Sequence, residues 1–251
     1  MKFIGIIPAR YKSTRFPGKP LAMLNGKPVI QWVYENASKA LDEVWVATDD
    51  DGIYNTVKEF GGRPVKTLST HHSGTDRCAE AALLLSRDTE FDVIINIQGD
   101  EPFIRAEQIS ALASGFDMDT EIATLIKKIE TTEELFNPNR PKVVIDKNNN
   151  ALYFSRSSIP YVRGEKEGNW LLATNFWVHI GMYAYKKNIL QQLTMLKPGI
   201  LERAEALEQL RWLENGYNIK TAVTEFQSIG IDTPEDLVRA EELLKKPGKN
   251  N

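Results

Sequence analysis

Short apolar runs alternate with stretches of helical periodicity through the first half of this 251-residue chain. The runs at 3–7, 44–47 and 91–97 have the length and the nearly continuous apolar character of buried strands. Between them, residues 29–41 and 53–60 repeat their apolar positions at helical spacing. This alternation predicts βαβ units and therefore a three-layer α/β fold, with a mostly parallel twisted sheet and helices on both faces.

The second half changes character between about residues 137 and 185, where the helical periodicity fades. Strand-like segments at 142–146 and 151–155 flank a polar turn, which indicates a hairpin or a lid-like insertion. The sequence has no repeat, no low-complexity tract and no long linker. We therefore expect a single domain over 1–251, with the segment at about 137–185 inserted in it as a subregion.

Two further helices are expected toward the C-terminal end of the sequence. Residues 201–213 form an amphipathic pattern, and a closing helix over 234–244 begins at Thr233 with a proline in the first helical position. The inward-facing positions of the first of these helices are Leu207, Leu210 and Leu213.

The charge balance limits the partners that this chain can have. Its formal net charge is −3 and its pI is about 5.8, so Lys and Arg are too few to cover a face. We expect neither nucleic acid nor a membrane as a partner. The only cysteine, Cys78, allows no intrachain disulfide and no cysteine-rich zinc site, which fits a cytoplasmic protein. The first apolar run stops at Pro8 and has neither a signal-peptide pattern nor the length of a membrane span.

A cationic loop follows the first predicted strand. Four of the ten residues from Arg10 to Lys19 are Arg or Lys, although the whole protein is acidic. Ligands of open α/β sheets bind beyond the carboxyl ends of the strands, where several cations would suit a polyphosphate. On this segment alone, a solvated basic loop is an equally good interpretation.

Two acidic residues lie where other predicted strands end. Asp100 follows the apolar strand at 91–97, and Asp232 follows Ile231 just before the closing helix. Taken alone, Asp100 is more simply explained as capping the turn before Pro102, and Asp232 as a residue that only precedes a helix. If both carboxylates met beside the cationic loop, they would form a metal–phosphate site.

Several other short patterns have structural explanations. Asp49–Asp51 and Asp117–Asp119 contain the Asp-x-Asp pattern of metal-dependent glycosyltransferases, but we interpret them as a helix cap and a surface turn. His71 and His72 are adjacent and lack a third ligand at a suitable spacing, which argues against zinc. Ser73–Arg77 opens a helix and either holds a nucleotide or only caps the helix. The dinucleotide fingerprint and the Walker A loop are absent from the sequence.

Eight segments in order along nearly the whole chain give the strongest signal. They are IIPARYKSTRFPGKPL, SGTDR, NIQGDEP, FNPNRPKVVID, ALYFSRSSIP, HIGMYAY, LEQLRWL and GIDTPEDL. Collinear and suitably spaced, they resemble the 3-deoxy-D-manno-octulosonate cytidylyltransferases, also called CMP-Kdo synthetases. Phe16 in the loop, and Asp76 where a longer acid is common, are conservative departures from the family pattern.

The resemblance implies a nucleotidyltransferase that supplies CMP-Kdo for lipopolysaccharide biosynthesis. The anomeric hydroxyl of Kdo would attack the α-phosphate of CTP and release pyrophosphate. Arg10 and Lys19 would neutralise charge on the triphosphate, and Ser13 would add a hydrogen bond. Asp100 and Asp232 would bind Mg²⁺, which screens the phosphate and lowers the pKa of the attacking hydroxyl. The implied catalytic residues are Arg10, Lys19 and Asp100.

Other positions of the family motifs imply contacts to the nucleoside and to the acceptor sugar. Gln98 and Ser73 would lie near the cytosine and its ribose, and Arg77 would assist in nucleotide binding. The residues that fall on the acceptor motifs are Arg156, His179, Tyr183, Glu208 and Gln209. Without the resemblance, all five would be interpreted as structural residues, either in the core or on the solvent-exposed face of a helix.

The family also implies a homodimer formed through the subregion, and the aromatic side chains that could make this contact are Trp170, Phe176 and Trp177. Three alternatives stay open at this point: a cytidylyltransferase for a related acidic sugar, a glycosyltransferase that uses Asp49–Asp51, and a non-catalytic nucleotide-binding module. Release of pyrophosphate from CTP separates the cytidylyltransferases from the other two.

Overall fold

The computed structural model describes residues 1–13, 15–227 and 229–245. The chain forms two compact units. The first consists of Met1–Ile109 together with the segment that begins at Ser228, and the second consists of Ser110–Gln227. The predicted subregion at about 137–185 lies inside the second unit, and the single domain over 1–251 stays a prediction.

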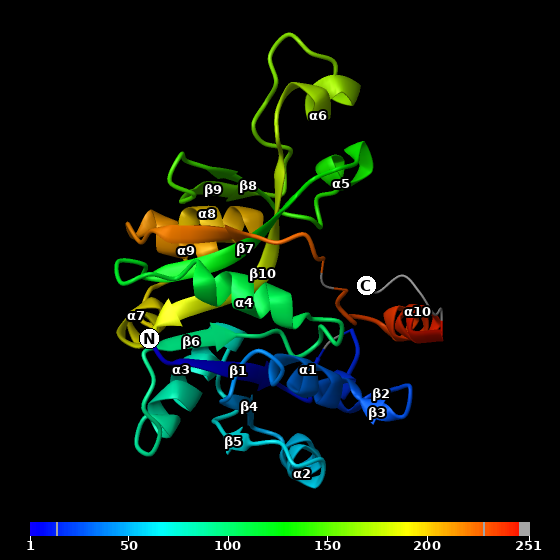
Figure 1. Cartoon of the computed structure of the whole chain (residues 1–251), viewed down its shortest axis with the longest axis vertical. Coiled ribbons are helices and arrows are strands. Elements are labelled where there is room, and N and C mark those ends of the chain that lie inside the picture. Colours follow the sequence, from blue (N-terminus) through cyan, green and yellow to red (C-terminus); the bar gives the residue numbers. More distant parts are fainter. Residues whose placement is uncertain (14, 228, 246–251) are drawn as a thin grey trace. The chain divides into compact units, whose positions relative to one another are not determined.

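The first unit is built around strand β1 (Phe3–Ala9), which lies between two parallel neighbours (Figure 1). It pairs with β4 (Val44–Thr48) on one side and with β6 (Val93–Asn96) on the other. Strand β5 (Pro64–Lys66) continues the sheet beyond β4, also in parallel. The carboxyl ends of these strands therefore meet at one edge, which is where open α/β sheets bind their ligands.

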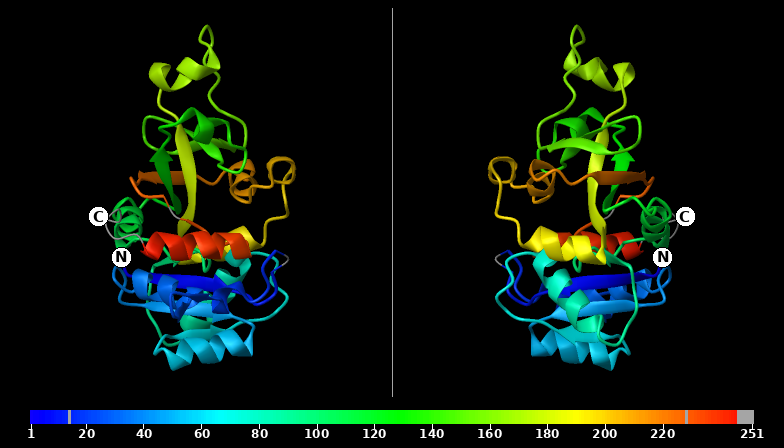
Figure 2. Two further views of the ribbon diagram at one scale, coloured as in Figure 1. Left: turned by 90° about the vertical axis from the view of Figure 1, so that its right-hand side faces the viewer. Right: turned by 90° about the vertical axis from the view of Figure 1, so that its left-hand side faces the viewer.

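Helices α1 (Val29–Ala37) and α3 (Gly74–Leu85) cover opposite faces of this sheet. Helix α1 packs on the face to which Ile7 points, whereas the start of α3 lies against Pro8. Successive side chains of a strand point to opposite faces, so these two contacts place the helices on different sides. Helix α2 (Asp51–Glu59) lies next to β4 and β5 (Figure 2).

The remaining elements of the first unit are short or belong to its C-terminal segment. They are the 3₁₀-helix η1 (Lys19–Leu21), the hairpin of β2 (Met23–Leu24) and β3 (Lys27–Pro28), and α10 (Pro234–Lys245). The predicted cap of α10 is confirmed, because the Thr233 hydroxyl accepts from the backbone N–H of Asp236 and the Asp236 carboxylate accepts from the N–H of Thr233. Helix α4 (Ala106–Ser114) begins in the first unit and ends in the second.

A small apolar cluster holds the cationic loop and the C-terminal segment together. Its buried members are Leu24, Val29, Ile231 and Ala240, with Phe16 and other partly buried side chains packed against them. Burial of this apolar surface fixes the chain on both sides of the loop. The cluster therefore sets the position of the residue after Ile231, which is Asp232.

The second unit contains a mixed sheet and the predicted hairpin. Strand β7 (Ile122–Lys128) pairs in parallel with β11 (Ile219–Val223) and antiparallel with β10 (Trp177–Lys186). Strands β8 (Lys142–Ile145) and β9 (Ala151–Ser155) form the antiparallel hairpin that the sequence predicted (Figure 1). The other elements are α5 (Thr132–Phe136), η2 (Glu167–Asn169), α6 (Trp170–Ala173), α7 (Lys187–Thr194), α8 (Ile200–Glu205) and α9 (Gln209–Glu214).

The prediction of one helix over 201–213 is wrong. Two short helices, α8 and α9, occupy this stretch, and Ala206 between them has a φ of 51°. That left-handed conformation interrupts the helix and frees carbonyl groups, two of which accept from the Arg156 guanidinium. The break also changes the buried face, since Trp212 is buried where Leu213 was expected to be.

The α/β fold predicted from the sequence is confirmed, with a mostly parallel arrangement of strands around β1 and helices on both faces. Among the residues that the structure describes, none of the helices combines the length and apolar character needed to cross a membrane.

Candidate active site

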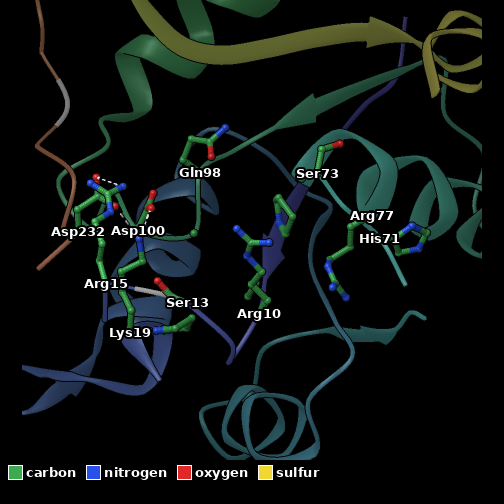
Figure 3. Close-up of a pocket in the computed structure, with 15 residues that line it drawn as sticks. Arg10, Ser13, Arg15, Lys19, His71, Ser73, Arg77, Gln98, Asp100 and Asp232 are labelled. Atoms are coloured by element: carbon green, nitrogen blue, oxygen red, sulfur yellow. Dashed lines mark hydrogen bonds and ion pairs between the residues drawn. The ribbon is translucent and has the colours of Figure 1, made fainter. Parts of the chain in front are cut away.

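A pocket of about 260 Å³ lies at the carboxyl edge of the sheet in the first unit (Figure 3). Residues after β1 and β6, the start of α3 and the C-terminal segment all contribute to it. The residues that line it are Pro8, Ala9, Arg10, Ser13, Arg15, Lys19, Pro20, His71, Ser73, Gly74, Arg77, Gln98, Gly99, Asp100 and Asp232. All eight residues expected to bind the nucleotide or the metal are among them.

Two strand ends approach each other closely at the floor of this pocket. A Cβ atom on Gly99 would lie 2.9 Å from the carbonyl oxygen of Pro8, which is closer than such atoms normally come. Only glycine therefore fits between the end of β1 and the residues after β6. This close approach lets Gln98 and Asp100 flank the start of the cationic loop.

The two predicted metal ligands converge on one cation. Lys19 Nζ lies 2.5 Å from Asp100 Oδ2 and 3.1 Å from Asp232 Oδ1. Arg15 Nη2 lies 3.1 Å from the other oxygen of Asp232. The backbone N–H of Ile231 donates to the Asp100 carbonyl at 2.8 Å, which holds the two distant segments in register. The juxtaposition of the two carboxylates with Lys19 agrees with the sequence prediction.

The donor set of this site fits a hard divalent cation. The Lys19 ammonium group contacts one carboxylate oxygen of each aspartate, so a cation at this position can contact both side chains. Among the described residues, no third His, Cys, Asp or Glu completes a metal-binding group. Mg²⁺ commonly takes only one or two protein carboxylates and obtains its other ligands from water and substrate phosphates. Asp100 and Asp232 could therefore hold Mg²⁺ when a triphosphate is bound.

Arg10 is exposed and lies at the centre of the pocket. It follows the last residue of β1, and its side chain lies between the aspartate pair and the start of α3 (Figure 3). Ser13 lies on the loop between Arg10 and Lys19 and also lines the pocket. Cations and hydroxyl groups in this arrangement can bind the oxygens of a polyphosphate along its length.

The start of α3 supplies the other end of the pocket. Ser73 caps the helix by accepting from the backbone N–H of Asp76, and the Asp76 carboxylate accepts in return from the N–H of Ser73. The capping interpretation of this segment is therefore confirmed, while Ser73 also lines the pocket. Arg77 lies one turn further along and is almost fully buried.

His71 lines the pocket, although its sequence context raised only the question of a zinc site. Its Nε2 lies 2.5 Å from Glu80 Oε2, and this carboxylate oxygen also accepts from the backbone N–H of Leu68. The pairing fixes the orientation of the imidazole at the pocket wall. The available signal was its position two residues before the helix cap Ser73.

The aspartate runs have separate structural roles. Asp50 caps α2 by accepting from the backbone N–H of Ile53, whereas Asp49 pairs with Arg77 and Asp51 pairs with Lys66. The cap predicted for Asp49–Asp51 is thus made by its middle residue alone. Asp117 accepts from the N–H groups of residues 119 and 120, as expected for a surface turn.

The five expected acceptor residues all lie in the second unit. His179 and Tyr183 are on β10, on either side of an irregularity between Ile180 and Tyr183, and their ring centroids are 5.3 Å apart. Burial lowers the pKa of His179 to about 3, so its imidazole is neutral at physiological pH. Burial, and then the charge of Glu208, raises the pKa of Tyr183 well above its ordinary value.

Two buried polar atoms of this group lack a hydrogen-bond partner among the described residues. They are the Tyr183 hydroxyl and the side-chain nitrogen of Gln209. Leaving such groups unpaired is unfavourable by roughly 1–3 kcal/mol each, so orphaned buried atoms point to a ligand or water. A hydroxyl group and an amide group together can form hydrogen bonds with the hydroxyl groups of a sugar.

The Arg156 guanidinium donates to backbone oxygens, while the backbone N–H of Arg156 donates to the Glu205 carboxylate. Its Nε donates to the Glu205 carbonyl at 2.6 Å, and its Nη1 donates to the Pro138 carbonyl at 3.0 Å. Lys142, which no sequence motif indicated as a site residue, is fully buried and donates to the carbonyls of Asn137 and Arg156. Burial lowers the pKa of Lys142, and the nearby Glu205 partly offsets this shift.

Cations, hydroxyl groups and a carboxylate pair at the carboxyl edge of a parallel sheet are typical of enzymes that transfer groups from nucleotide polyphosphates, among them the nucleotidyltransferases. The cytidylyltransferase family model matches residues 4–222. The chain belongs to the cytidylyltransferase family, and within it to the 3-deoxy-manno-octulosonate cytidylyltransferases.

Relatives of this family cover almost the whole chain. The 3-deoxy-manno-octulosonate cytidylyltransferase of Parabacteroides distasonis is 58% identical over 245 residues, covering 96% of this chain and 97% of that protein. The enzyme of the same name from Bacteroides thetaiotaomicron is 55% identical over 249 residues, covering 98% and 99%. A solved structure of CMP:2-keto-3-deoxy-manno-octonic acid synthetase complexed with CTP has a TM-score of 0.89 and 41% identity, covering 98% and 99%.

Proposed function

We propose that this protein transfers CMP from CTP to the anomeric hydroxyl of Kdo, giving CMP-Kdo and pyrophosphate, with Mg²⁺ as cofactor. The observation that carries the proposal is the meeting of Asp100, Asp232 and Lys19 beside the cationic loop in a chain of this family. A bond would form between the anomeric oxygen and the α-phosphorus. The bond between the α-phosphorus and the oxygen that bridges to the β-phosphate would break, pyrophosphate would leave with that oxygen, and the hydroxyl proton would pass to solvent.

Different residues of the pocket bind different parts of the nucleotide. Arg10 and Lys19 bind the triphosphate oxygens, and the Ser13 hydroxyl adds a hydrogen bond. Gln98, Ser73 and Arg77 lie at the pocket wall for the nucleoside. Directional donors and acceptors select a base better than charge alone does, because they must match its edge.

The magnesium ion would be held by Asp100 and Asp232. When bound, it neutralises charge on the α-phosphate and lowers the pKa of the attacking hydroxyl. Arg10 and Lys19 contribute by stabilising negative charge on the phosphate oxygens and on the leaving pyrophosphate.

The acceptor residues supply recognition of an acidic sugar. His179 is neutral, and Tyr183 keeps its proton because its pKa is raised, so both can exchange hydrogen bonds with sugar hydroxyls. Glu208 and Gln209 add an acceptor and a donor, and Arg156 supplies the positive charge that attracts the sugar carboxylate. The unpaired Tyr183 hydroxyl and Gln209 amide nitrogen support this assignment.

Incubation of the purified protein with CTP, Kdo and Mg²⁺ tests the proposal directly. We expect stoichiometric release of pyrophosphate and formation of CMP-Kdo, measured by a coupled phosphate assay and by mass spectrometry. A folded protein that releases no pyrophosphate under these conditions contradicts the proposal. Parallel reactions with other acidic sugars establish which acceptor is preferred.

Replacement of one carboxylate tests the metal role. Asp100→Asn should lower kcat by about a hundredfold or more, because the amide keeps the shape of the side chain but loses the charge that binds Mg²⁺. Its thermal unfolding should stay within a few degrees of the unchanged protein. Full activity of this variant would exclude the metal role of Asp100.

The proposal includes a cytoplasmic homodimer that serves lipopolysaccharide biosynthesis. Trp170 and Phe176 stack on each other at 6.1 Å and are buried within the second unit, so they are not available for contact with a second subunit. Tyr161 and Leu172 of the same subregion are 75% and 87% exposed, and these side chains could make a subunit contact.

A further inference from the structure

The first aspartate of the Asp49–Asp51 run has no role in the helix that follows it. Asp50 makes the cap of α2, and Asp51 pairs with Lys66 at the surface. Asp49 instead points its Oδ1 at Arg77 Nη2, at a distance of 2.8 Å. This oxygen is buried and makes no hydrogen bond within the described part of the chain, so Arg77 is what compensates its charge.

The Arg77 guanidinium contacts side chains on two sides. Its Nη1 donates to the Thr67 hydroxyl at 2.6 Å, while Nη2 faces Asp49. Asp49 follows β4, Thr67 follows β5, and Arg77 belongs to α3, so three elements fix one guanidinium. Only 4% of Arg77 is exposed, yet it lines the pocket.

The position of Arg77 in the pocket indicates which part of a nucleotide it meets. It lies with Ser73 and His71 at the end away from Asp100 and Asp232 (Figure 3). Triphosphate and metal belong at the carboxylate end, so the nucleoside belongs at the end formed by α3. Cytosine offers two acceptors, O2 and N3, to donors such as a guanidinium, whereas the N3 of uracil carries a proton and repels a donor.

We propose that Asp49, with Thr67, is a positioning residue that holds the Arg77 guanidinium toward the nucleobase and thereby sets the preference for CTP over UTP. This inference rests on the proposed function. A guanidinium on a long flexible side chain binds a base more tightly when its orientation is fixed in advance, because less rotamer freedom is then lost on binding. The ion pair and the hydroxyl contact supply that preorganisation before the nucleotide arrives.

Asp49→Asn tests the inference by calorimetric titration with CTP and with UTP. We expect the Kd for CTP to rise about tenfold, because the ion pair that holds the Arg77 guanidinium in place is lost. The Kd for UTP should change by less than about threefold, so the preference for CTP falls. In turnover assays the KM for CTP should rise, while kcat and the KM for the sugar stay within about twofold.

Asp51→Asn is the matched control, since it removes a carboxylate two positions away that is 91% exposed and pairs with Lys66 at the surface. This variant should bind CTP as the unchanged protein does. If Asp49→Asn does not fold, Thr67→Val removes the second contact to Arg77 with nearly the same shape. It should weaken CTP binding in the same direction.

A double variant separates positioning from a general structural role. If Asp49 acts through Arg77, Asp49→Asn should add almost nothing to the loss of CTP affinity that Arg77→Lys causes. Unchanged CTP binding by Asp49→Asn, equal weakening for CTP and UTP, or full additivity in the double variant would overturn the inference. If calorimetry detects no binding of CTP to the unchanged protein, the proposed function fails, and this inference fails with it.

Discussion

At the residue scale, Lys19 is the most informative side chain of the pocket. Its ammonium group neutralises Asp100 and Asp232 at the point where a divalent cation would contact both carboxylates. It is only 12% exposed, so this pairing is less screened by water than the surface pairs of the chain. The Mg²⁺ proposed above would therefore have to compete with the Lys19 ammonium group for the same carboxylate oxygens when no nucleotide is bound.

This competition predicts an increase in metal affinity when the lysine is removed. Lys19→Met should bind Mn²⁺ about tenfold more tightly in the absence of nucleotide, because a competing positive charge beside both carboxylates is gone. Its affinity for CTP should fall if, as proposed, Lys19 also binds phosphate oxygens. Electron paramagnetic resonance of free Mn²⁺ measures the first effect without any turnover. Equal or weaker Mn²⁺ binding by Lys19→Met would contradict the shared position.

His179 predicts a pH dependence of stability. Its pKa is about 3 in the folded protein, below the ordinary value of 6.5, so the unfolded chain binds the proton more readily. Stability is therefore unaffected by this group above pH 6.5 and falls as the pH drops from 6.5 toward 3. At pH 5 the loss should be about 2 kcal/mol.

Urea unfolding of the unchanged protein and of His179→Gln measures this effect, since glutamine keeps a polar side chain that does not titrate. The difference in unfolding free energy between the two proteins should shift by this amount between pH 7 and pH 5. Parallel pH profiles for the two proteins would exclude His179 as the cause.

At the element scale, the start of α3 combines two functions in one short segment. The capping box of Ser73 and Asp76 satisfies backbone N–H groups, which stabilises the helix, and the same turn presents Arg77 to the pocket. The break between α8 and α9 works in a related way. Ala206 interrupts a helix, and the freed carbonyls of Glu205 and Ala206 hold Arg156.

The two halves of the capping box predict how the roles of Ser73 can be separated. Ser73→Ala and Asp76→Ala should each lower stability by about 1 kcal/mol, because each removes one capping contact. Only Ser73→Ala should also raise the KM for CTP, by about threefold or more, because its hydroxyl lines the pocket. Thermal unfolding and steady-state kinetics on both variants check this. If the KM for CTP is the same in the two variants, Ser73 caps the helix and does not contribute to nucleotide binding.

At the scale of the whole molecule, the proposed homodimer gives a direct prediction. Light scattering coupled to size-exclusion chromatography should give twice the chain mass of 28.4 kDa. Leu172→Asp should shift the population toward the single chain, because a charge on an exposed apolar side chain opposes its burial. Tyr217→Phe, outside the subregion, is the control. A single-chain mass at micromolar concentration would contradict the dimer.

Much of the site could be predicted from the sequence because its residues belong to continuous segments. The cationic loop, the acid after β6 and the cap of α3 each lie at the end of an element whose type the apolar pattern determines. The Asp49–Arg77 pair could not be predicted in this way. Its partners are far apart along the chain, and a run of three aspartates has no local feature that separates the cap from the pair.

The sequence by itself determined the α/β alternation and, through eight collinear motifs, the family, because strand and helix periodicity and motif order are local properties of the chain. Only the tertiary structure decided which carboxylates share Lys19, which aspartate pairs with Arg77, and that Ala206 divides the helix expected over 201–213. These features depend on packing between segments that are distant in sequence. Burial makes each charge there require a partner, and only the folded chain supplies it.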